Sequence, residues 1–163
     1  FTAATDSLYV GASMILTPDK RTDMQLLETL KVFFLDIGFA SLTFSDPEEH
    51  DRIIAFTSQL AHIVSSAYVK SPEAQHILNA VHTAPGMELY TGDSFRDLTR
   101  IARINEDMWT ELFLDDADYL TDELDILIGH LQEYADALKS KDAEHLRALL
   151  RDGREKKATA GGN

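Results

Sequence analysis

The stretch Ser94–Trp109, SFRDLTRIARINEDMW, combines a cluster of arginines with the apolar spacing of a helix in an otherwise acidic chain. Arg96, Arg100 and Arg103 are three of the eight arginines and follow a four-then-three spacing. At about 100° per residue, this spacing places them within roughly 60° of one another on a helix. Arginine forks bind carboxylates bidentately, so the segment predicts a site for an anionic ligand. The side that would bury this helix carries Phe95, Leu98, Ile101 and Ala102.

The composition of the whole chain excludes several classes of partner. Its 163 residues carry a formal net charge of −13, which disfavours nucleic acid and anionic membranes because both attract basic proteins. An anionic substrate therefore needs a local positive pocket. No segment approaches the roughly 20 apolar residues of a membrane helix, no signal peptide is apparent, and the lack of cysteine excludes disulfides and thiolate chemistry. These features are typical of a cytoplasmic protein.

Residues 1–45 have the pattern of a parallel α/β unit. Two short apolar runs, 12–17 and 39–44, flank a segment with helical apolar spacing, 22–37, that stops at a glycine. This order is one strand-helix-strand crossover, and two strands are too few for a sheet that stands alone. We therefore expect the C-terminal end of a Rossmann-type α/β domain. The first residue is Phe1 rather than methionine, so we also expect a longer protein.

From residue 46 onward the sequence predicts helices alone, which makes the fold mainly α. Ser45 with Glu48, and Ser94 with Asp97, have the spacing of capping boxes at two helix starts. The apolar pattern from 106 to 138 is long enough for one very long helix or for two joined near residues 115 and 116. The other helices are expected over 45–68 and 72–83, from 93 onward, and over 141–155.

Arg100 is the strongest candidate for binding a substrate. Its guanidinium group can hold a carboxylate, or it can be a surface group paired with Asp97 or Glu106. Asp97 and Trp109 also have structural interpretations, the first as a residue of the first helical turn and the second as a core side chain. The other two arginines of the segment are expected to be solvated or ion-paired.

Ser58 and His62 lie one turn apart in the first long helix. They belong to a stripe of small or polar residues that either faces water or packs closely against another helix. A serine hydrolase is not favoured, because no nucleophile elbow and no third triad member accompany them. Metal binding is not favoured either, since the side chains of residues 48–51 point in different directions and no HExxH spacing occurs.

The Ser94–Trp109 segment resembles the signature of the prephenate dehydrogenase family. The helical domain of that family carries an Asp-x-x-Arg-Ile-Ala stretch followed by Met-Trp, matched here by Asp97, Thr99, Arg100, Ile101, Ala102, Met108 and Trp109. The resemblance covers nearly the whole chain. It implies that residues 1–45 close a nucleotide-binding domain and that 46–155 form an all-helical dimerisation and substrate-binding domain like the C-terminal domain of 6-phosphogluconate dehydrogenase. The composition of the C-terminus independently predicts that residues 156–163 are a disordered tail.

The resemblance also assigns residues to a site. The matching arginine of the family binds the substrate carboxylate, which implies this role for Arg100. Ser58 and His62 would line the substrate pocket, where the histidine can hydrogen-bond substrate or a tyrosine inhibitor. Asp97 and Trp109 would reach the active site of the partner subunit in a homodimer whose sites are completed across the interface. Long apolar helices in so short a chain independently favour such a homodimer.

The activity that the resemblance implies is oxidative decarboxylation of prephenate to 4-hydroxyphenylpyruvate, with hydride transfer to NAD or NADP, on the route to tyrosine. The chain has no GxGxxG loop and lacks the catalytic His-Pro motif of the family. No catalytic or cofactor-binding residue is therefore assigned, and the chain alone is expected to be inactive. The alternatives are an arogenate dehydrogenase, which acts on the aminated substrate, and a non-catalytic helical dimerisation or ligand-sensing module.

Overall fold

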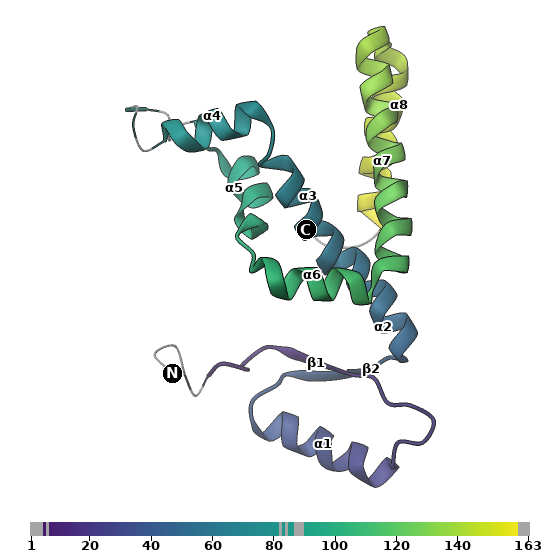
Figure 1. The fold of residues 1–163 in the computed structure, drawn as a ribbon. Coiled ribbons are helices and arrows are strands. Elements are labelled where there is room, and N and C mark those ends of the chain that lie inside the picture. Colours follow the sequence, from purple (N-terminus) through teal and green to yellow (C-terminus); the bar gives the residue numbers. More distant parts are fainter. Residues whose placement is uncertain (1–4, 6, 82, 84, 87–89, 160–163) are drawn as a thin grey trace. The chain divides into compact units, whose positions relative to one another are not determined.

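The computed structural model describes residues 5, 7–81, 83, 85, 86 and 90–159, and it confirms the mainly helical fold. The chain divides into two compact units, residues 1–116 and 117–163. The first contains a two-stranded sheet and most of the helices, and the second is a pair of long helices (Figure 1). None of the helices in the described ranges has the length and hydropathy that crossing a membrane requires.

The first unit begins with the predicted strand-helix-strand crossover. β1 (Ser13–Leu16) pairs in parallel with β2 (Ser41–Phe44), and α1 (Met24–Asp36) connects them along one face of the pair (Figure 1). Asp23 caps α1, because its carboxylate accepts a hydrogen bond from the backbone N–H of Gln25 at 2.8 Å. Phe39 is buried beside the end of α1, where it forms the small core of this part. The boundary expected between residues 45 and 46 coincides with the change from strands to helices, and as a domain boundary it stays a prediction.

A nearly continuous helical path follows the sheet. It consists of α2 (Pro47–Ile54), the π-helical segment η1 (Ala55–Leu60) and α3 (Ala61–Tyr68). The expected helix over residues 45–68 therefore has the right extent, but its middle is wound with hydrogen bonds between residues five apart. Ala55 and Leu60 are buried, so the π-helical segment contributes apolar side chains to the core.

Both predicted capping boxes are wrong. Asp46 rather than Ser45 caps α2, because its carboxylate accepts a hydrogen bond from the backbone N–H of Glu49 at 2.9 Å. The hydroxyl of Ser45 instead donates to the carboxylate of Glu49 at 3.0 Å. At the start of α5 (Asp93–Thr99) the N-cap is Gly92, which has no side chain to accept such a bond.

The remaining helices of the first unit are short. α4 (Pro72–Ala80) is capped by the residue before it, and α5 leads into the single 3-10 turn η3 (Arg100–Ala102). α6 (Glu106–Asp115) begins after Asn105, whose side chain accepts a hydrogen bond from the backbone N–H of Met108 at 3.0 Å. The apolar pattern from 106 to 138 thus forms two helices joined at residues 115 and 116, which was one of the two expected arrangements.

The second unit is a helical hairpin. α7 (Ala117–Ser140) and α8 (Ala143–Thr159) are joined by a tight turn in which Lys141 has a φ of 55°, and Asp142 caps α8 by accepting a hydrogen bond from His145 N at 2.9 Å. Residues 156–159, which were expected to be part of a disordered tail, continue α8. This correction follows from the helix-forming residues of the last turn, and the rest of the expected tail lies outside the described residues.

Candidate functional site

The arginine segment does not form one continuous α-helix. α5 ends at Thr99, Arg100 begins the 3-10 turn, and Arg103 is extended, with φ −84° and ψ 92°. The prediction that the arginines share one face of an α-helix is therefore wrong. A buried contact competes with the helix. The hydroxyl of Ser65 donates a hydrogen bond at 2.6 Å to the carbonyl of Leu98. In an uninterrupted α-helix, this carbonyl would accept a hydrogen bond from the backbone N–H four residues later.

The three arginines nevertheless line one open hollow of the molecule, called the arginine hollow below. Its volume is about 600 Å³, within the range of about 300–1,000 Å³ that is usual for small-molecule sites. Its walls come from the end of α3, one side of α4, and the segment from α5 to Arg103. They carry Val69, Gln75, Leu78, Arg96, Asp97, Thr99, Arg100, Ala102 and Arg103.

The arginine hollow is positively charged. Among the described residues that line it, Asp97 is the one acidic side chain. Arg96 has an ion pair with a neighbouring exposed aspartate, at a distance of 3.8 Å. The ion pairs of arginines in the described ranges include neither Arg100 nor Arg103, so the two acidic neighbours considered for Arg100, Asp97 and Glu106, are not its partners. Within the described residues, Arg100 could therefore bind a carboxylate ligand without first breaking an ion pair.

Ser58 and His62 contact each other through the backbone of the π-helical segment. Nδ1 of His62 lies 2.8 Å from the carbonyl oxygen of Ser58. A carbonyl only accepts hydrogen bonds, so Nδ1 carries the hydrogen and Nε2 is the acceptor of the neutral ring. His62 is half-buried and therefore presents this nitrogen in a defined orientation. Short π-helical segments are frequent at functional sites.

Trp109 of α6 covers the imidazole of His62 in the same chain. The two ring centroids are 3.8 Å apart with 31° between the ring planes, and Phe113 supports the indole from one turn further along α6. The resemblance implied that Trp109 reaches the site of the partner subunit. The contact between Trp109 and His62 lies within one chain, and the role of Trp109 in the site of the partner subunit stays a prediction. Ser58, His62 and Trp109 are called the histidine cluster below.

The five predicted site residues thus fall into two groups. Arg100 and Asp97 line the arginine hollow, whereas the three residues of the histidine cluster do not. α3 connects the two groups. His62 lies near the start of this helix, and Val69, the residue directly after its end, lines the arginine hollow. In the described part of the chain, no three histidine, cysteine or acidic side chains gather as a metal site requires.

A buried polar contact that sequence reasoning missed supports the histidine cluster. Gln59, in the π-helical segment, is 6% exposed, and its Nε2 donates at 2.9 Å to Oδ2 of Asp116. Burial raises the pKa of the Asp116 carboxyl, and the negative charge of Asp51 raises this pKa further. Asp116 directly follows α6, so the contact ties the π-helical segment to the helix that carries Trp109. The two residues are 57 positions apart, and no local pattern reveals the pairing.

Replacing Asp116 with alanine is expected to lower the free energy of unfolding by about 1–3 kcal/mol, because the buried amide of Gln59 loses its described partner. Urea denaturation of the variant measures this loss. Asp115→Ala is the matched control, since Asp115 is exposed at the end of the same helix. If the two variants were equally stable, the contact would contribute no free energy to the fold.

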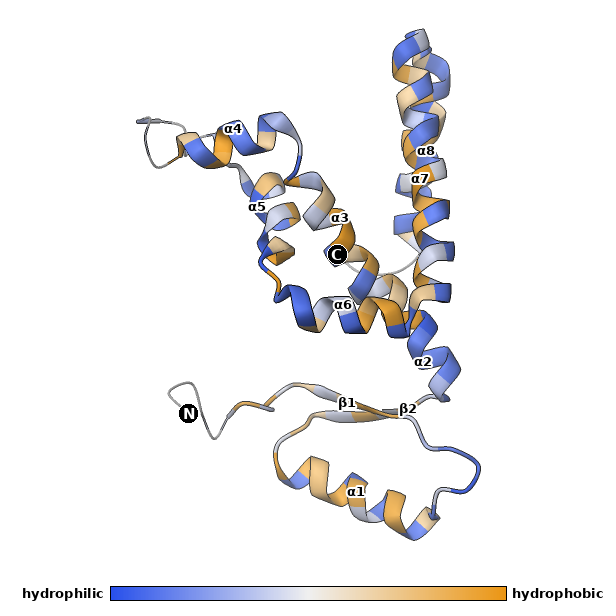
Figure 2. Ribbon diagram, viewed as in Figure 1, coloured by the Kyte–Doolittle hydropathy of each residue, from blue (hydrophilic) through white to orange (hydrophobic). Residues whose placement is uncertain are grey.

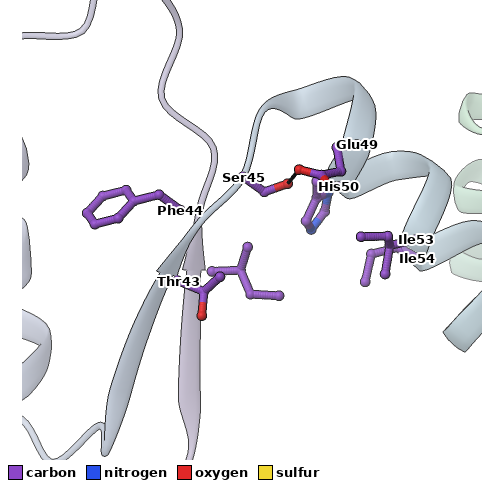
Figure 3. Close-up of a pocket in the computed structure, with 8 residues that line it drawn as sticks. Thr43, Phe44, Ser45, Glu49, His50, Ile53 and Ile54 are labelled. Carbon is purple, nitrogen blue, oxygen red and sulfur yellow. Dashed lines mark hydrogen bonds between the residues drawn. The ribbon is translucent and has the colours of Figure 1, made fainter. Parts of the chain in front are cut away.

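A second pocket lies at the carboxyl ends of β1 and β2, between these strands and α2 (Figure 3). It has a volume of about 260 Å³ and is lined by Ile15, Thr43, Phe44, Ser45, Glu49, His50, Ile53 and Ile54. Nδ1 of His50 lies 2.9 Å from the carboxylate of Asp51. In parallel α/β sheets, ligands bind outside the carboxyl ends of the strands. The pocket therefore lies where the sheet and the helices together can contact a ligand.

Comparisons with known proteins identify the family. A family model described as the dimerisation domain of prephenate dehydrogenase matches residues 46–152. The prephenate dehydrogenase of Bacillus subtilis (strain 168) is 32% identical over 144 residues, which cover 88% of this chain and 37% of that protein. The cyclohexadienyl dehydrogenase of Zymomonas mobilis is 29% identical over 139 residues, which cover 85% of this chain and 46% of that protein.

A solved structure shares the fold. The crystal structure of prephenate dehydrogenase from A. aeolicus in complex with hydroxyphenyl propionate and NAD+ matches with a TM-score of 0.74 at 26% identity, covering 98% of this chain and 54% of that one. The chain spans less than half the length of the two curated relatives. Because the family model covers most of its length, and because relatives named for this activity match in both sequence and fold, the chain belongs to the prephenate dehydrogenase family of oxidoreductases.

Proposed function

We propose that the chain is the substrate-binding and dimerisation part of a prephenate dehydrogenase. The reaction removes a hydride from the ring of prephenate and passes it to NAD or NADP, releases the ring carboxylate as carbon dioxide, and leaves 4-hydroxyphenylpyruvate. The observation that carries the proposal is the arginine hollow, which Arg100 lines, and the resemblance to the family implies that this arginine binds the substrate carboxylate. On this proposal the protein is a cytoplasmic enzyme of tyrosine biosynthesis.

Arg100 holds a carboxylate of the substrate. Two N–H groups of one guanidinium can donate to the two oxygens of a carboxylate, which fixes both the position and the orientation of the ligand. Asp97 lines the same hollow and limits its positive charge. Arg100 therefore contributes positioning and charge neutralisation rather than proton transfer.

The histidine cluster binds the ring end of the substrate. Nε2 of His62 accepts a hydrogen bond from the ring hydroxyl, because Nδ1 is already occupied by the carbonyl of Ser58. Trp109 restricts the rotation of the imidazole by stacking against it. Tyrosine carries a phenol hydroxyl that can donate to the same nitrogen, so we also assign a tyrosine inhibitor to this place.

The nicotinamide cofactor is bound mainly by the part of the nucleotide-binding domain that lies outside these 163 residues. The 163 residues contain no GxGxxG segment, so none of them is assigned to the cofactor. When bound, the cofactor accepts the hydride. The A. aeolicus relative was crystallised with NAD+, which makes NAD the first cofactor to test.

A homodimer is part of the proposal. α7 carries several hydrophobic positions along its length (Figure 2). Four of its large apolar side chains are more than half exposed: Ile126, Ile128, Leu131 and Leu138. The matching family model is described as a dimerisation domain. Light scattering after size-exclusion chromatography is therefore expected to give twice the mass of one chain. A stable monomer at working concentration would contradict this part of the proposal.

Rates on two substrates test the proposed function against its alternatives. The full-length protein is expected to oxidise prephenate in the presence of NAD or NADP. A higher kcat/KM for arogenate would replace the proposal with an arogenate dehydrogenase, which performs the same chemistry on the aminated substrate. Absence of turnover on both substrates, in a protein that contains a nucleotide-binding domain, would favour a non-catalytic dimerisation or ligand-sensing module.

A further inference from the structure

We propose that Arg103 binds the second carboxylate of the substrate and makes the arginine hollow select a doubly anionic keto acid over its aminated analogue. The inference rests on the proposed function and adds the substrate property on which the same site discriminates. Sequence alone assigned Arg103 to solvent or to an ion pair. The structure places it in the same cavity as Arg100.

The local backbone aligns Arg103 with Arg100. Side chains three residues apart in a 3-10 turn lie one above the other, whereas in an α-helix they are about 60° apart around the axis. The turn η3 begins at Arg100 and ends at Ala102, and Arg103 is the C-cap residue directly after it. Because the buried hydroxyl of Ser65 occupies the carbonyl of Leu98, the chain leaves the α-helix just before this turn. The guanidinium groups of Arg100, at the start of the turn, and Arg103, directly after its end, therefore line the same cavity.

The charge of the hollow favours a dianion. Three guanidinium groups and one carboxylate line it, which gives a formal local charge of +2 in a chain whose net charge is −13. Prephenate carries two carboxylates and no cation, whereas arogenate carries an additional ammonium group and a net charge of −1. Both substrates carry the same two carboxylates, so a second guanidinium discriminates between them by repelling the ammonium group of arogenate. Arg103 therefore disfavours arogenate relative to prephenate.

Arg103 fits this role better than Arg96 does. The guanidinium of Arg96 lies 3.8 Å from the carboxylate of Asp93. Part of its charge is thus already offset by a neighbour. The ion pairs found in the described residues do not include Arg103, so its charge acts on the hollow without an acidic partner.

The test is the ratio of kcat/KM for prephenate to kcat/KM for arogenate, measured on the full-length protein. Arg103→Gln keeps a polar, hydrogen-bonding side chain but removes its charge, so this ratio is expected to fall about tenfold. Arg103→Glu, which reverses the charge, is expected to lower the ratio further, and Arg103→Lys should keep most of it. Arg154→Gln is the matched control, because Arg154 is an exposed arginine of α8 that does not line the hollow.

The outcomes separate this inference from the proposed function. A ratio that stays the same in both Arg103→Gln and Arg103→Glu would overturn the role of Arg103, and so would a wild-type protein that prefers arogenate. In either case the proposal that the protein is a dehydrogenase of this family would be unaffected. If the wild-type protein oxidised neither substrate, the proposed function itself would fail.

Discussion

Replacing Arg100 with alanine in the full-length protein is expected to lower kcat/KM for prephenate by about 100-fold, which corresponds to about 2.7 kcal/mol. This is the size of effect that losing a bidentate, charge-assisted contact to a carboxylate produces. The KM for NAD should not change, because Arg100 lines the arginine hollow and the chain contains no nucleotide-binding loop. Steady-state kinetics with each substrate varied in turn measures both quantities.

Two further variants sharpen this prediction. Arg154→Ala removes an exposed arginine far along the sequence, in α8, and should leave both constants unchanged. Arg100→Lys keeps the charge but loses the planar fork, so its kcat/KM should lie between those of the wild type and Arg100→Ala. If Arg100→Ala weakened prephenate and NAD equally, Arg100 would be a structural residue and not the carboxylate ligand.

The 163-residue chain by itself is expected to show no measurable oxidation of prephenate by NAD. It contains neither a GxGxxG loop nor the catalytic His-Pro motif of the family, so hydride transfer has no bound acceptor. The full-length protein at the same concentration is the positive control. Circular dichroism of the isolated chain shows whether its helices are formed. This measurement distinguishes inactivity caused by the missing cofactor-binding residues from inactivity caused by unfolding. Turnover by the isolated, folded chain would contradict the account of where the cofactor binds.

Much of the fold could be predicted from local patterns. The strands and α1 follow from apolar periodicity and turn residues, which act over a few positions, whereas the break at residues 115 and 116 was one of two arrangements that the pattern allowed. The π-helical segment and the 3-10 turn could not be predicted in this way. The hydrogen bond from Ser65 to Leu98 spans 33 positions, and that from Gln59 to Asp116 spans 57. Such contacts override local propensity and leave no periodic signal in the sequence.

In the candidate site, too, local patterns predicted the residues but not the contacts between distant segments. Charge and spacing identified the arginines that gather around one hollow, although the expected geometry, a single helix face, is wrong. The pairing of Trp109 with His62 depends on how α6 crosses α3, so the sequence named both residues without placing them together. Gln59 had no distinguishing pattern, because a buried amide looks like any surface glutamine until its burial is known.

The central claim is that Arg100 holds a carboxylate of prephenate in the arginine hollow. A crystal structure of the full-length protein with prephenate and without NAD tests it directly, since the substrate then binds but cannot be oxidised. We predict that a carboxylate of prephenate accepts hydrogen bonds from the guanidinium group of Arg100. Prephenate bound elsewhere, with Arg100 in solvent or paired with a protein carboxylate, would contradict the account.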